Sequence, residues 1–460
     1  MTKPQKIVVL VAFHQKNCTL KDVAGGFGTV FTVGNSPFAR LLEVAKRRIA
    51  SLPNITLPYL HALFQRHGVE VAVLEINGEK ELEKLVPADL YLIASSIVDC
   101  NFERSIASRV RRLFGSRVGV FGTFASTVPE FFEECADFIV QGEIENIAPR
   151  LAAGESFSGL VDAGFVRDLD ALPFPNWDQF DLGRYRYEII STKGVTLPLL
   201  SSRGCTFTCG YCPYLVNNKY RARTPENVLA EIQHLVERYN VRGISFRDPL
   251  FVFNRARSIH MADLLIQSGL NIRFSIESRT DCMDVPLLEK LHAAGLRSME
   301  VGVESYDEEV LRNNSRKPPQ KEQQEEIIRR CHQLGIRVIA NYTFGLLTDT
   351  PAGIGRTIAY AKKLNTFAIQ FTVTTPYPGT DFYEKVKDQI FEKDWEKFNG
   401  WTNVFRHPSM SPDQLHALRE YAYVSYHLRP RYVWRFLEST LLHPLLYRDS
   451  LGPSPQAAPG

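Results

Sequence analysis

Three cysteines stand close together near the middle of the chain, in a segment that reads SRGCTFTCGYCPY. Cys205, Cys209 and Cys212 have CxxxCxxC spacing and directly follow a strand-like run. A structural zinc ion takes four protein ligands, and neither cysteine nor histidine occurs in the twenty residues after Cys212. Three cysteines can instead hold a four-iron four-sulfur cluster, which leaves one iron open to a small molecule.

A disulfide and unrelated buried thiols are the alternative interpretations of this segment. The chain has only eight cysteines among 460 residues, so this spacing would seldom arise by chance. Closely spaced cysteines in an intracellular chain more often indicate a metal or a catalytic site. We therefore predict a cluster whose open iron is the reactive position.

The segment resembles the signature of the radical S-adenosylmethionine (SAM) superfamily, CxxxCx-aromatic-C, with Tyr211 as the aromatic residue. In that superfamily the open iron binds the amino and carboxylate groups of SAM, and an electron from the cluster cleaves SAM to methionine and a 5′-deoxyadenosyl radical. The resemblance implies that Cys205, Cys209 and Cys212 hold the cluster. It also implies an electron donor such as flavodoxin or ferredoxin.

The overall composition is that of an ordinary soluble globular protein with two to four domains. The chain is 44% hydrophobic and 23% charged and has a net charge of +3, which argues against a disordered or nucleic-acid-coating protein. The first apolar run is too short for a signal peptide. No stretch reaches the roughly 18 apolar residues of a membrane span. We therefore expect a cytoplasmic protein with reduced thiols.

Residues 1–155 alternate strand-like and helix-like segments, which predicts a doubly wound parallel sheet. Strands are expected at 6–13, 69–76, 89–98, 117–124 and 137–142, and helices at 38–50, 57–67, 102–114, 129–135 and 144–153. Ligands of such sheets bind at the carboxyl ends of the strands. The residues at those ends are Ser95, Ser96, Gly122, Thr123, Gly142 and Glu143.

This first region is similar to the Rossmann-like cobalamin-binding domain that precedes the radical SAM domain in one large subgroup. The similarity lies in LPYLHALFQRHGVEV and DFIVQGEIE, and it implies that the six strand-end residues contact cobalamin. The chain departs from the subgroup in having Phe121-Gly122 where a double glycine is usual. It has no DxHxxG sequence for a lower axial ligand, for which His14 is an outside candidate. By itself, such a sheet could equally hold a nucleotide or nothing.

Residues 156–190 read as an ordered linker, and residues 191–385 return to alternating strands and helices. Strands are expected at 196–201, 243–247, 272–278, 298–303, 338–345 and 367–374, and helices at 225–239, 256–269, 285–294, 320–334 and 354–364. This pattern predicts six β/α units curled into a partial barrel, the (β/α)6 core expected of a radical SAM domain. In β/α barrels the chemistry lies at the carboxyl ends of the strands.

Polar side chains and glycines stand at those barrel strand ends. Carboxylates suit ribose hydroxyls and an ammonium group, arginine suits a carboxylate, and glycine permits a close backbone approach. The resemblance therefore implies a SAM pocket, for which the candidates are Asp248, Glu277, Arg279, Glu304, Ser305, Thr343 and Gly345. The alternative for Glu304 and Arg279 is a simple pair across adjacent strands. Gly345-Leu346-Leu347 departs from the glycine-leucine-proline that is usual after the fifth strand.

Residues 386–450 are expected to form a short helical carboxyl-terminal region, followed by a disordered tail at 451–460. Arginines alternate with aromatic residues and leucines between Arg431 and Arg448. Such a segment could lie on a membrane surface. A helix packed on the barrel is the more common outcome.

The resemblance implies methyl transfer to an unactivated carbon, or phosphorus, of a small-molecule or lipid-like metabolite through the 5′-deoxyadenosyl radical and methylcobalamin. A cobalamin-dependent cyclase or rearrangement enzyme is the alternative among enzymes. A corrinoid-binding sensor or carrier with a structural cluster is the alternative of another class. RNA is not expected as a partner, because the charge is near neutral and a second cysteine set is missing. No side chain is an obvious catalytic residue. Tyr214, Tyr342 and Cys100 are considered only as candidate proton or radical partners.

Overall fold

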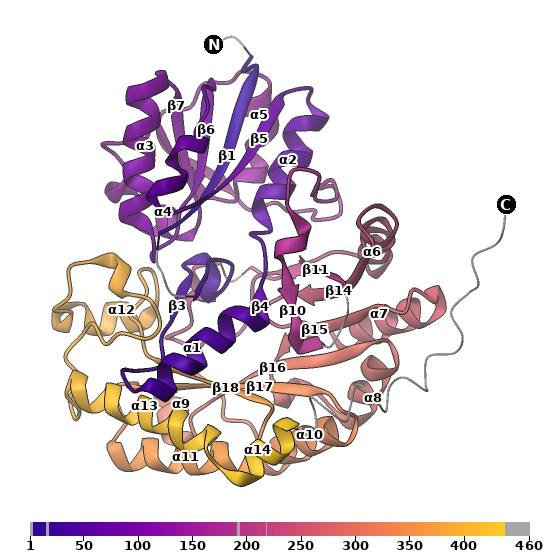
Figure 1. The fold of residues 1–460 in the computed structure, drawn as a ribbon, viewed down its shortest axis with the longest axis vertical. Helices are drawn as coiled ribbons and strands as arrows, with labels where there is room; N and C mark the ends of the chain where they lie inside the picture. The colour runs from indigo at the N-terminus through magenta and orange to yellow at the C-terminus, as the bar shows by residue number, and fades with distance from the viewer. Residues whose placement is uncertain (1–2, 15–17, 191–193, 218, 438–460) are drawn as a thin grey trace.

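A computed structural model describes residues 3–14, 18–190, 194–217 and 219–437 of the chain. It contains two six-stranded parallel sheets, one above the other in Figure 1. The amino-terminal sheet has the strand order β5-β1-β6-β7-β8-β9. Its strands are β1 (Lys6–Phe13), β5 (Glu70–Asn77), β6 (Leu90–Ala94), β7 (Arg117–Phe121), β8 (Phe138–Gly142) and β9 (Gly159–Gly164).

The amino-terminal sheet is doubly wound, as predicted. The chain leaves β1 for β5 on one side and then returns to β6 on the other, which places the topological switch point between β1 and β6. Ile7 and Val9 of β1 face one hydrophobic core, whereas Val8 and Leu10 face another. The continuous apolar run of β1 therefore reflects a strand that is buried on both faces. The covering helices are α2 (Thr56–Arg66), α3 (Cys100–Phe114), α4 (Thr123–Thr127) and α5 (Ala148–Ala152).

A strand and a helix of the amino-terminal sheet differ from the sequence expectation. Strand β9 adds a sixth strand to the five predicted and lies in a stretch that reads as loop. The helix expected at 129–135 is only a 3-10 turn at Pro129–Phe131, and α4 forms just before it.

The second sheet is the predicted partial barrel. Its six strands follow one another in the order β11-β14-β15-β16-β17-β18 and are parallel throughout. Within the described residues β11 and β18 do not pair with each other, so the barrel stays open on one side. The strands are β11 (Val195–Leu199), β14 (Val241–Phe246), β15 (Arg273–Ser278), β16 (Leu296–Glu304), β17 (Arg337–Phe344) and β18 (Ala368–Val373).

Helices wrap the outside of the barrel and begin at capping residues. Thr224, Asn254, Asp284 and Thr350 each accept a hydrogen bond from the backbone N–H three residues later. Such caps satisfy N–H groups that the first helical turn leaves without partners. The helices are α6 (Pro225–Tyr239), α7 (Arg255–Ser268), α8 (Val285–Ala293), α9 (Glu308–Asn313), α10 (Lys321–Gln333) and α11 (Pro351–Leu364).

A segment of the first 55 residues reaches down to the barrel (Figure 1). Its helix α1 lies against α13, and Glu420 of α13 accepts the backbone N–H groups of Asn35 (3.0 Å) and Ser36 (2.9 Å). The aromatic ring of Phe31 packs edge-on against Trp401. The elements of the segment are β2 (Cys18–Leu20), β3 (Thr29–Phe31), α1 (Pro37–Ile49) and β4 (Ala50–Ser51), which pairs with β10 (Arg186–Tyr187).

The carboxyl-terminal region is helical, as expected. It contains α12 (Asp381–Val386), α13 (Pro412–His427) and α14 (Pro430–Leu437). The described residues contain no helix that is long and apolar enough to cross a membrane. The rest of the basic aromatic segment, 438–448, and the tail at 451–460 lie outside the described residues.

Candidate functional site

A cavity of about 520 Å³ lies between the two sheets. One wall is formed by the carboxyl ends of the amino-terminal strands, and it includes Ser95, Gly122, Thr123, Gly142 and Glu143. The opposite wall belongs to the barrel and is formed by Leu200, Arg203, Gly204, Tyr214 and Arg247. Five of the six strand-end residues predicted for cobalamin therefore face one cavity, and Ser96 is the exception.

Two glycines keep the strand ends of the amino-terminal wall free of side chains. Gly122 has φ +119°, and a Cβ atom there would lie 2.7 Å from the carbonyl oxygen of Ser95. Gly142 has φ +98°, and a Cβ atom would lie 2.3 Å from the carbonyl oxygen of Gly164. A side chain is excluded at both positions because its Cβ atom would meet the chain's own backbone. Both glycines also line the cavity.

Ser96 and Thr123 hold neighbouring segments in place. The Thr123 hydroxyl donates to the carbonyl oxygen of Gly25 at 2.6 Å, which anchors the glycine-rich stretch after β2 beside the cavity. Ser96 is fully buried and bonds Lys21, whose ammonium group lies 2.9 Å from Asp99 and 2.7 Å from Glu103. Burial alone would lower the pKa of Lys21, but the two carboxylates raise it above the usual value. No local sequence pattern indicated this buried cluster, because Lys21 and Glu103 are 82 residues apart.

The cysteine loop runs between β12 (Ser202–Arg203) and β13 (Arg221–Ala222). Its backbone is tied to the barrel because Gly210 donates to the carbonyl oxygen of Asn314 and accepts from the N–H of Phe382, each at 2.9 Å. Cys209 is buried, and all three thiols of the loop are free.

Two arginines face the buried thiol of this loop. Nη1 of Arg316 lies 3.9 Å from the Cys209 sulfur, and Nη1 of Arg279 lies 4.0 Å from it. Burial and the neighbouring charge of Cys209 raise the pKa of the thiols of Cys205 and Cys212. Three thiolates that repel one another beside two guanidinium groups fit an anionic iron-sulfur cluster.

A cluster has different spatial needs from a single metal ion. Within the described ranges, no three His, Cys, Asp or Glu side chains converge closely enough to hold one ion. Three cysteines could hold an iron-sulfur cluster, whereas a structural zinc ion takes four protein ligands.

Glu304 and Arg279 both lie near the cysteine loop, but each is bonded to other partners. Arg279 donates to Asp281 at 2.9 and 2.7 Å and stacks on Phe207. Glu304 has φ +66° and accepts a hydrogen bond from the Thr343 hydroxyl at 2.8 Å. Arg316 lies 3.8 Å from Glu304 and connects it to Cys209. The alternative of a direct Glu304–Arg279 pair is therefore wrong.

Glu277 faces the barrel interior and pairs with Arg247 at 2.8 Å. Burial raises the pKa of Glu277 to about 7, although the Arg247 charge opposes this shift. Arg247 also lines the cavity, so this ion pair joins the barrel interior to the shared space. Arg247 was not among the residues predicted from the sequence.

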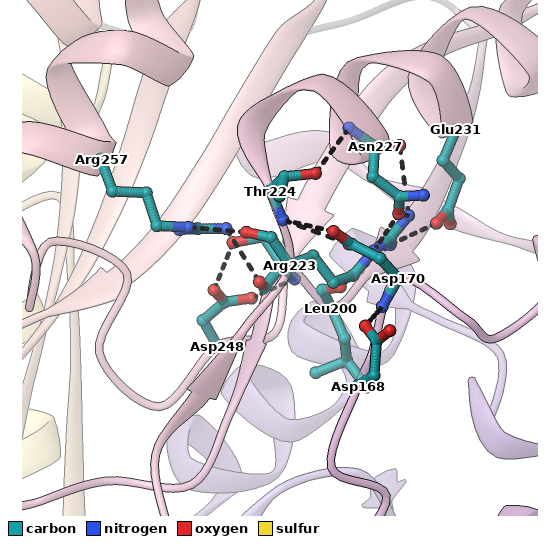
Figure 2. Close-up of polar contacts among 10 residues, drawn as sticks. Asp168, Asp170, Leu200, Arg223, Thr224, Asn227, Glu231, Asp248 and Arg257 are labelled. Atoms are coloured by element: carbon teal, nitrogen blue, oxygen red, sulfur yellow. Dashed lines mark hydrogen bonds and ion pairs between the residues drawn. The ribbon is translucent and has the colours of Figure 1, made fainter.

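Asp248 supports the start of the cysteine loop and does not line the cavity. It is fully buried and accepts from the backbone and hydroxyl of Ser201, at 2.8 and 2.5 Å, and from the Ser202 hydroxyl at 2.7 Å. Arg257 donates to the carbonyl oxygens of Ser201 and Arg223. Figure 2 shows Asp248, Arg223 and Arg257 gathered around this strand end. These hydrogen bonds hold the strand end from which the cysteine loop starts.

Ser305 and Gly345 also form hydrogen bonds within their own segments of the chain. The Ser305 hydroxyl accepts from the N–H of Asp307 at 3.1 Å. Gly345 has φ +83°, and its N–H donates to the Asp349 carboxylate at 3.0 Å. Asp349 thus closes the turn that lacks the usual proline.

The four remaining candidate residues lie in different parts of the structure. Tyr214 lines the cavity. Tyr342 and Cys100 are fully buried in hydrophobic cores. His14 is exposed, and its backbone N–H donates to Asp99. Of these four residues, only Tyr214 has access to a molecule in the cavity.

Known proteins match the barrel and the order of the domains. The model of the Radical SAM superfamily matches residues 199–361. An uncharacterised methyltransferase of Pyrococcus horikoshii is 25% identical, covering 65% of this chain and 68% of its own length. The bacteriochlorophyllide d C-8(2)-methyltransferase of Chlorobaculum tepidum is 26% identical, covering 77% and 80%. The anaerobic magnesium-protoporphyrin IX monomethyl ester cyclase of Rubrivivax gelatinosus is 29% identical, covering 54% and 44%.

Two solved structures are similar to this chain over most of its length. The radical SAM methyltransferase TsrM of Kitasatospora setae, with cobalamin and a [4Fe-4S] cluster, has a TM-score of 0.62 at 16% identity, covering 92% of this chain and 85% of TsrM. The cobalamin-dependent SAM radical enzyme OxsB, with aqua-cobalamin and SAM, has a TM-score of 0.65 at 15% identity, covering 99% and 74%. These similarities show the fold.

Proposed function

We propose that this chain, in which residues 199–361 match the radical SAM domain, is a cobalamin-dependent methyltransferase. Its substrate would be a small-molecule or lipid-like metabolite, methylated at an unactivated carbon. The observation that carries this proposal is a cavity between the two sheets. It is lined on one side by Gly122 and Gly142, which we call the glycine wall, and on the other by Arg203 and Gly204 at the start of the cysteine loop. Radical chemistry needs such a shared space, because a radical exposed to water is quenched.

Particular residues take the cofactors in this proposal. Cys205, Cys209 and Cys212 would hold the [4Fe-4S] cluster, with Tyr211 inside the same loop. Glu277, Arg279, Glu304, Thr343 and Gly345 would surround SAM. Ser95, Gly122, Thr123 and Gly142 would contact cobalamin. When bound, the cluster and SAM supply a carbon radical, and cobalamin supplies a methyl group.

The charged side chains around the proposed SAM site suit the charges of SAM. Arg316 and Arg279 offer positive charge beside Cys209, and Glu304 offers negative charge within 3.8 Å of Arg316. SAM carries both a carboxylate and cationic groups, so a site with both signs of charge suits it. The three cysteines of the loop are free, which fits a location in the reducing cytoplasm. Flavodoxin or ferredoxin would supply the electron.

A labelling experiment tests the proposal. A deletion strain and its parent are grown with methionine that carries a deuterated methyl group, and their metabolites are compared by mass. We expect one metabolite in the parent that carries a labelled methyl group and, in the deletion strain, its unmethylated precursor. A parent that accumulates no such labelled product would contradict methyl transfer.

The similarity to a protein named as a cyclase favours cyclisation as the second candidate. Both candidates predict 5′-deoxyadenosine when purified protein is incubated anaerobically with SAM and a reductant. They differ in the product, because a cyclase adds no methyl group. Failure to form 5′-deoxyadenosine, with or without candidate substrates, would instead favour a corrinoid-binding sensor or carrier.

A further inference from the structure

The cysteine loop is bracketed by a short hairpin that carries two arginines. Strands β12 and β13 pair antiparallel, and Arg203 lies directly opposite Arg221 in this ladder. Arg203 is only two residues before Cys205. Any element that holds these two arginines therefore also holds both ends of the loop.

Both arginines reach across to the amino-terminal sheet. Arg221 forms a two-bond pair with Glu143, with nitrogen-oxygen distances of 2.7 and 2.8 Å. Arg203 lies 3.3 Å from Glu143 and 2.8 Å from Glu145. Glu143 and Glu145 follow β8 and line the cavity together with Arg203. We call these four residues the latch.

The latch is largely buried and balanced in charge. The side chains of Arg203 and Arg221 are 13% and 12% exposed, and those of Glu143 and Glu145 are 8% and 4% exposed. Burial alone would raise the pKa of Glu143, but the hydrogen bond from Arg221 and the charges of both arginines lower it. The loss of one member would leave the buried charges of the latch unbalanced, which is more costly than the loss of a surface ion pair.

We propose that the latch sets the position of the cysteine loop relative to the glycine wall, with Arg221 as a positioning residue. This inference rests on the proposed function. Radical formation needs only the cluster and SAM, both on the barrel side. Transfer of a methyl group from SAM to cobalamin would also need the correct position of the opposite wall, because Gly122 and Gly142 of that wall would hold cobalamin. The methyl–sulfur bond of SAM would break in that transfer, with S-adenosylhomocysteine as the by-product.

The two by-products of SAM separate these steps in one experiment. Wild type and Arg221→Gln are loaded with iron, sulfide and cobalamin and incubated anaerobically with SAM and a titanium(III) reductant. A misplacement of about 1 Å can cost about a hundredfold in rate, so we expect S-adenosylhomocysteine formation to fall by about tenfold or more. Formation of 5′-deoxyadenosine, iron content and bound cobalamin should stay close to wild type.

Arg330→Gln is the matched control. Arg330 of α10 pairs with Glu289 of α8, at 2.8 and 2.5 Å, on the outside of the barrel. Its loss removes an arginine–glutamate ion pair that is more exposed than the latch, at 31% and 44%, and lies away from the cavity, so it should change neither by-product. Arg221→Lys keeps the charge but loses the two-bond geometry, so it should restore part of the S-adenosylhomocysteine rate.

Amide hydrogen exchange of the unloaded protein gives a readout that is independent of turnover. We expect faster exchange in residues 202–222 of Arg221→Gln than in wild type, and no change there in Arg330→Gln. An equal fall of both by-products, or unchanged exchange in 202–222, would overturn the latch. If wild type forms no S-adenosylhomocysteine, the proposed function fails, and the exchange result alone decides the latch.

Discussion

Arg316 places a guanidinium nitrogen 3.9 Å from the sulfur of Cys209. This arginine is 6% exposed and also donates to the carbonyl oxygen of Gly302. Under the proposed function, Cys209 would be a cluster ligand, and this buried positive charge would stabilise the electron that is added on reduction. The position of Arg316 would therefore affect the redox potential of the proposed cluster.

We predict that Arg316→Gln makes the midpoint potential of the reconstituted cluster more negative, by some tens of millivolts, with iron content retained. The reason is the loss of one positive charge beside the thiolate. The measurement is a redox titration followed by electron paramagnetic resonance. Arg312→Gln is the control, because Arg312 forms only an exposed ion pair with Glu308 and should leave the potential unchanged. Equal potentials in all three proteins would refute the electrostatic role of Arg316.

Gly122→Ala should prevent cobalamin binding and destabilise the amino-terminal sheet. A Cβ atom at this position would lie 2.7 Å from a backbone oxygen, and the backbone has φ +119°. Gly115→Ala is the matched control, because Gly115 also has positive φ, at +64°, but no atom lies within 4 Å of its Cβ position. We expect the control to cost only about 1 kcal/mol.

The two glycine variants are compared by thermal unfolding and by the absorbance of bound cobalamin. Gly115→Ala should retain cobalamin at the wild-type ratio. A Gly122→Ala variant that also bound cobalamin at that ratio would show that the backbone at Gly122 does not contact the ligand.

Asp349 should make stability depend on pH. Burial raises its pKa from 3.8 to about 7, although the N–H groups of Gly345 and Leu346 donate to it. The folded state therefore holds the proton more tightly than the unfolded state. Its stabilising contribution is complete below pH 3.8 and is lost as pH rises towards about 7. The slope reaches at most about 1.4 kcal/mol per pH unit.

Asp349→Asn tests this effect, because asparagine keeps an oxygen acceptor for the two N–H groups and does not titrate. The free energy of unfolding is measured in urea between pH 5 and pH 7 for both proteins. We expect the difference, variant minus wild type, to increase with pH. A constant difference would mean that the Asp349 pKa is not raised in the folded protein.

Much of the fold was predictable because its strands are buried on both faces. The continuous apolar run of β1 has this pattern, and so do β11, β14, β15 and β17 of the barrel, whereas β16 and β18 alternate buried and partly buried residues. Strand β9 reads GLVDAG and has no buried residue, because it lies at the edge of its sheet. Only its pairing with β8 makes it a strand, and such a pairing leaves no local pattern in the sequence.

The site was predictable where the spacing of residues is local and unpredictable where it is not. The cysteine loop lies within one short segment, whereas Lys21 meets Glu103 across 82 residues and Arg221 meets Glu143 across 78. The rule that strand ends carry functional residues selected Asp248 and Ser305. It could not indicate that their side chains point towards the local backbone.

The central claim is that three thiolates hold an iron-sulfur cluster that cleaves SAM. The most direct test combines iron analysis with 5′-deoxyadenosine formation in wild type and in Cys209→Ala, after anaerobic reconstitution. We predict about four iron atoms per wild-type chain and 5′-deoxyadenosine with SAM and reductant, with both strongly reduced in the variant. Zinc in place of iron, or equal iron and 5′-deoxyadenosine in the two proteins, would contradict the claim.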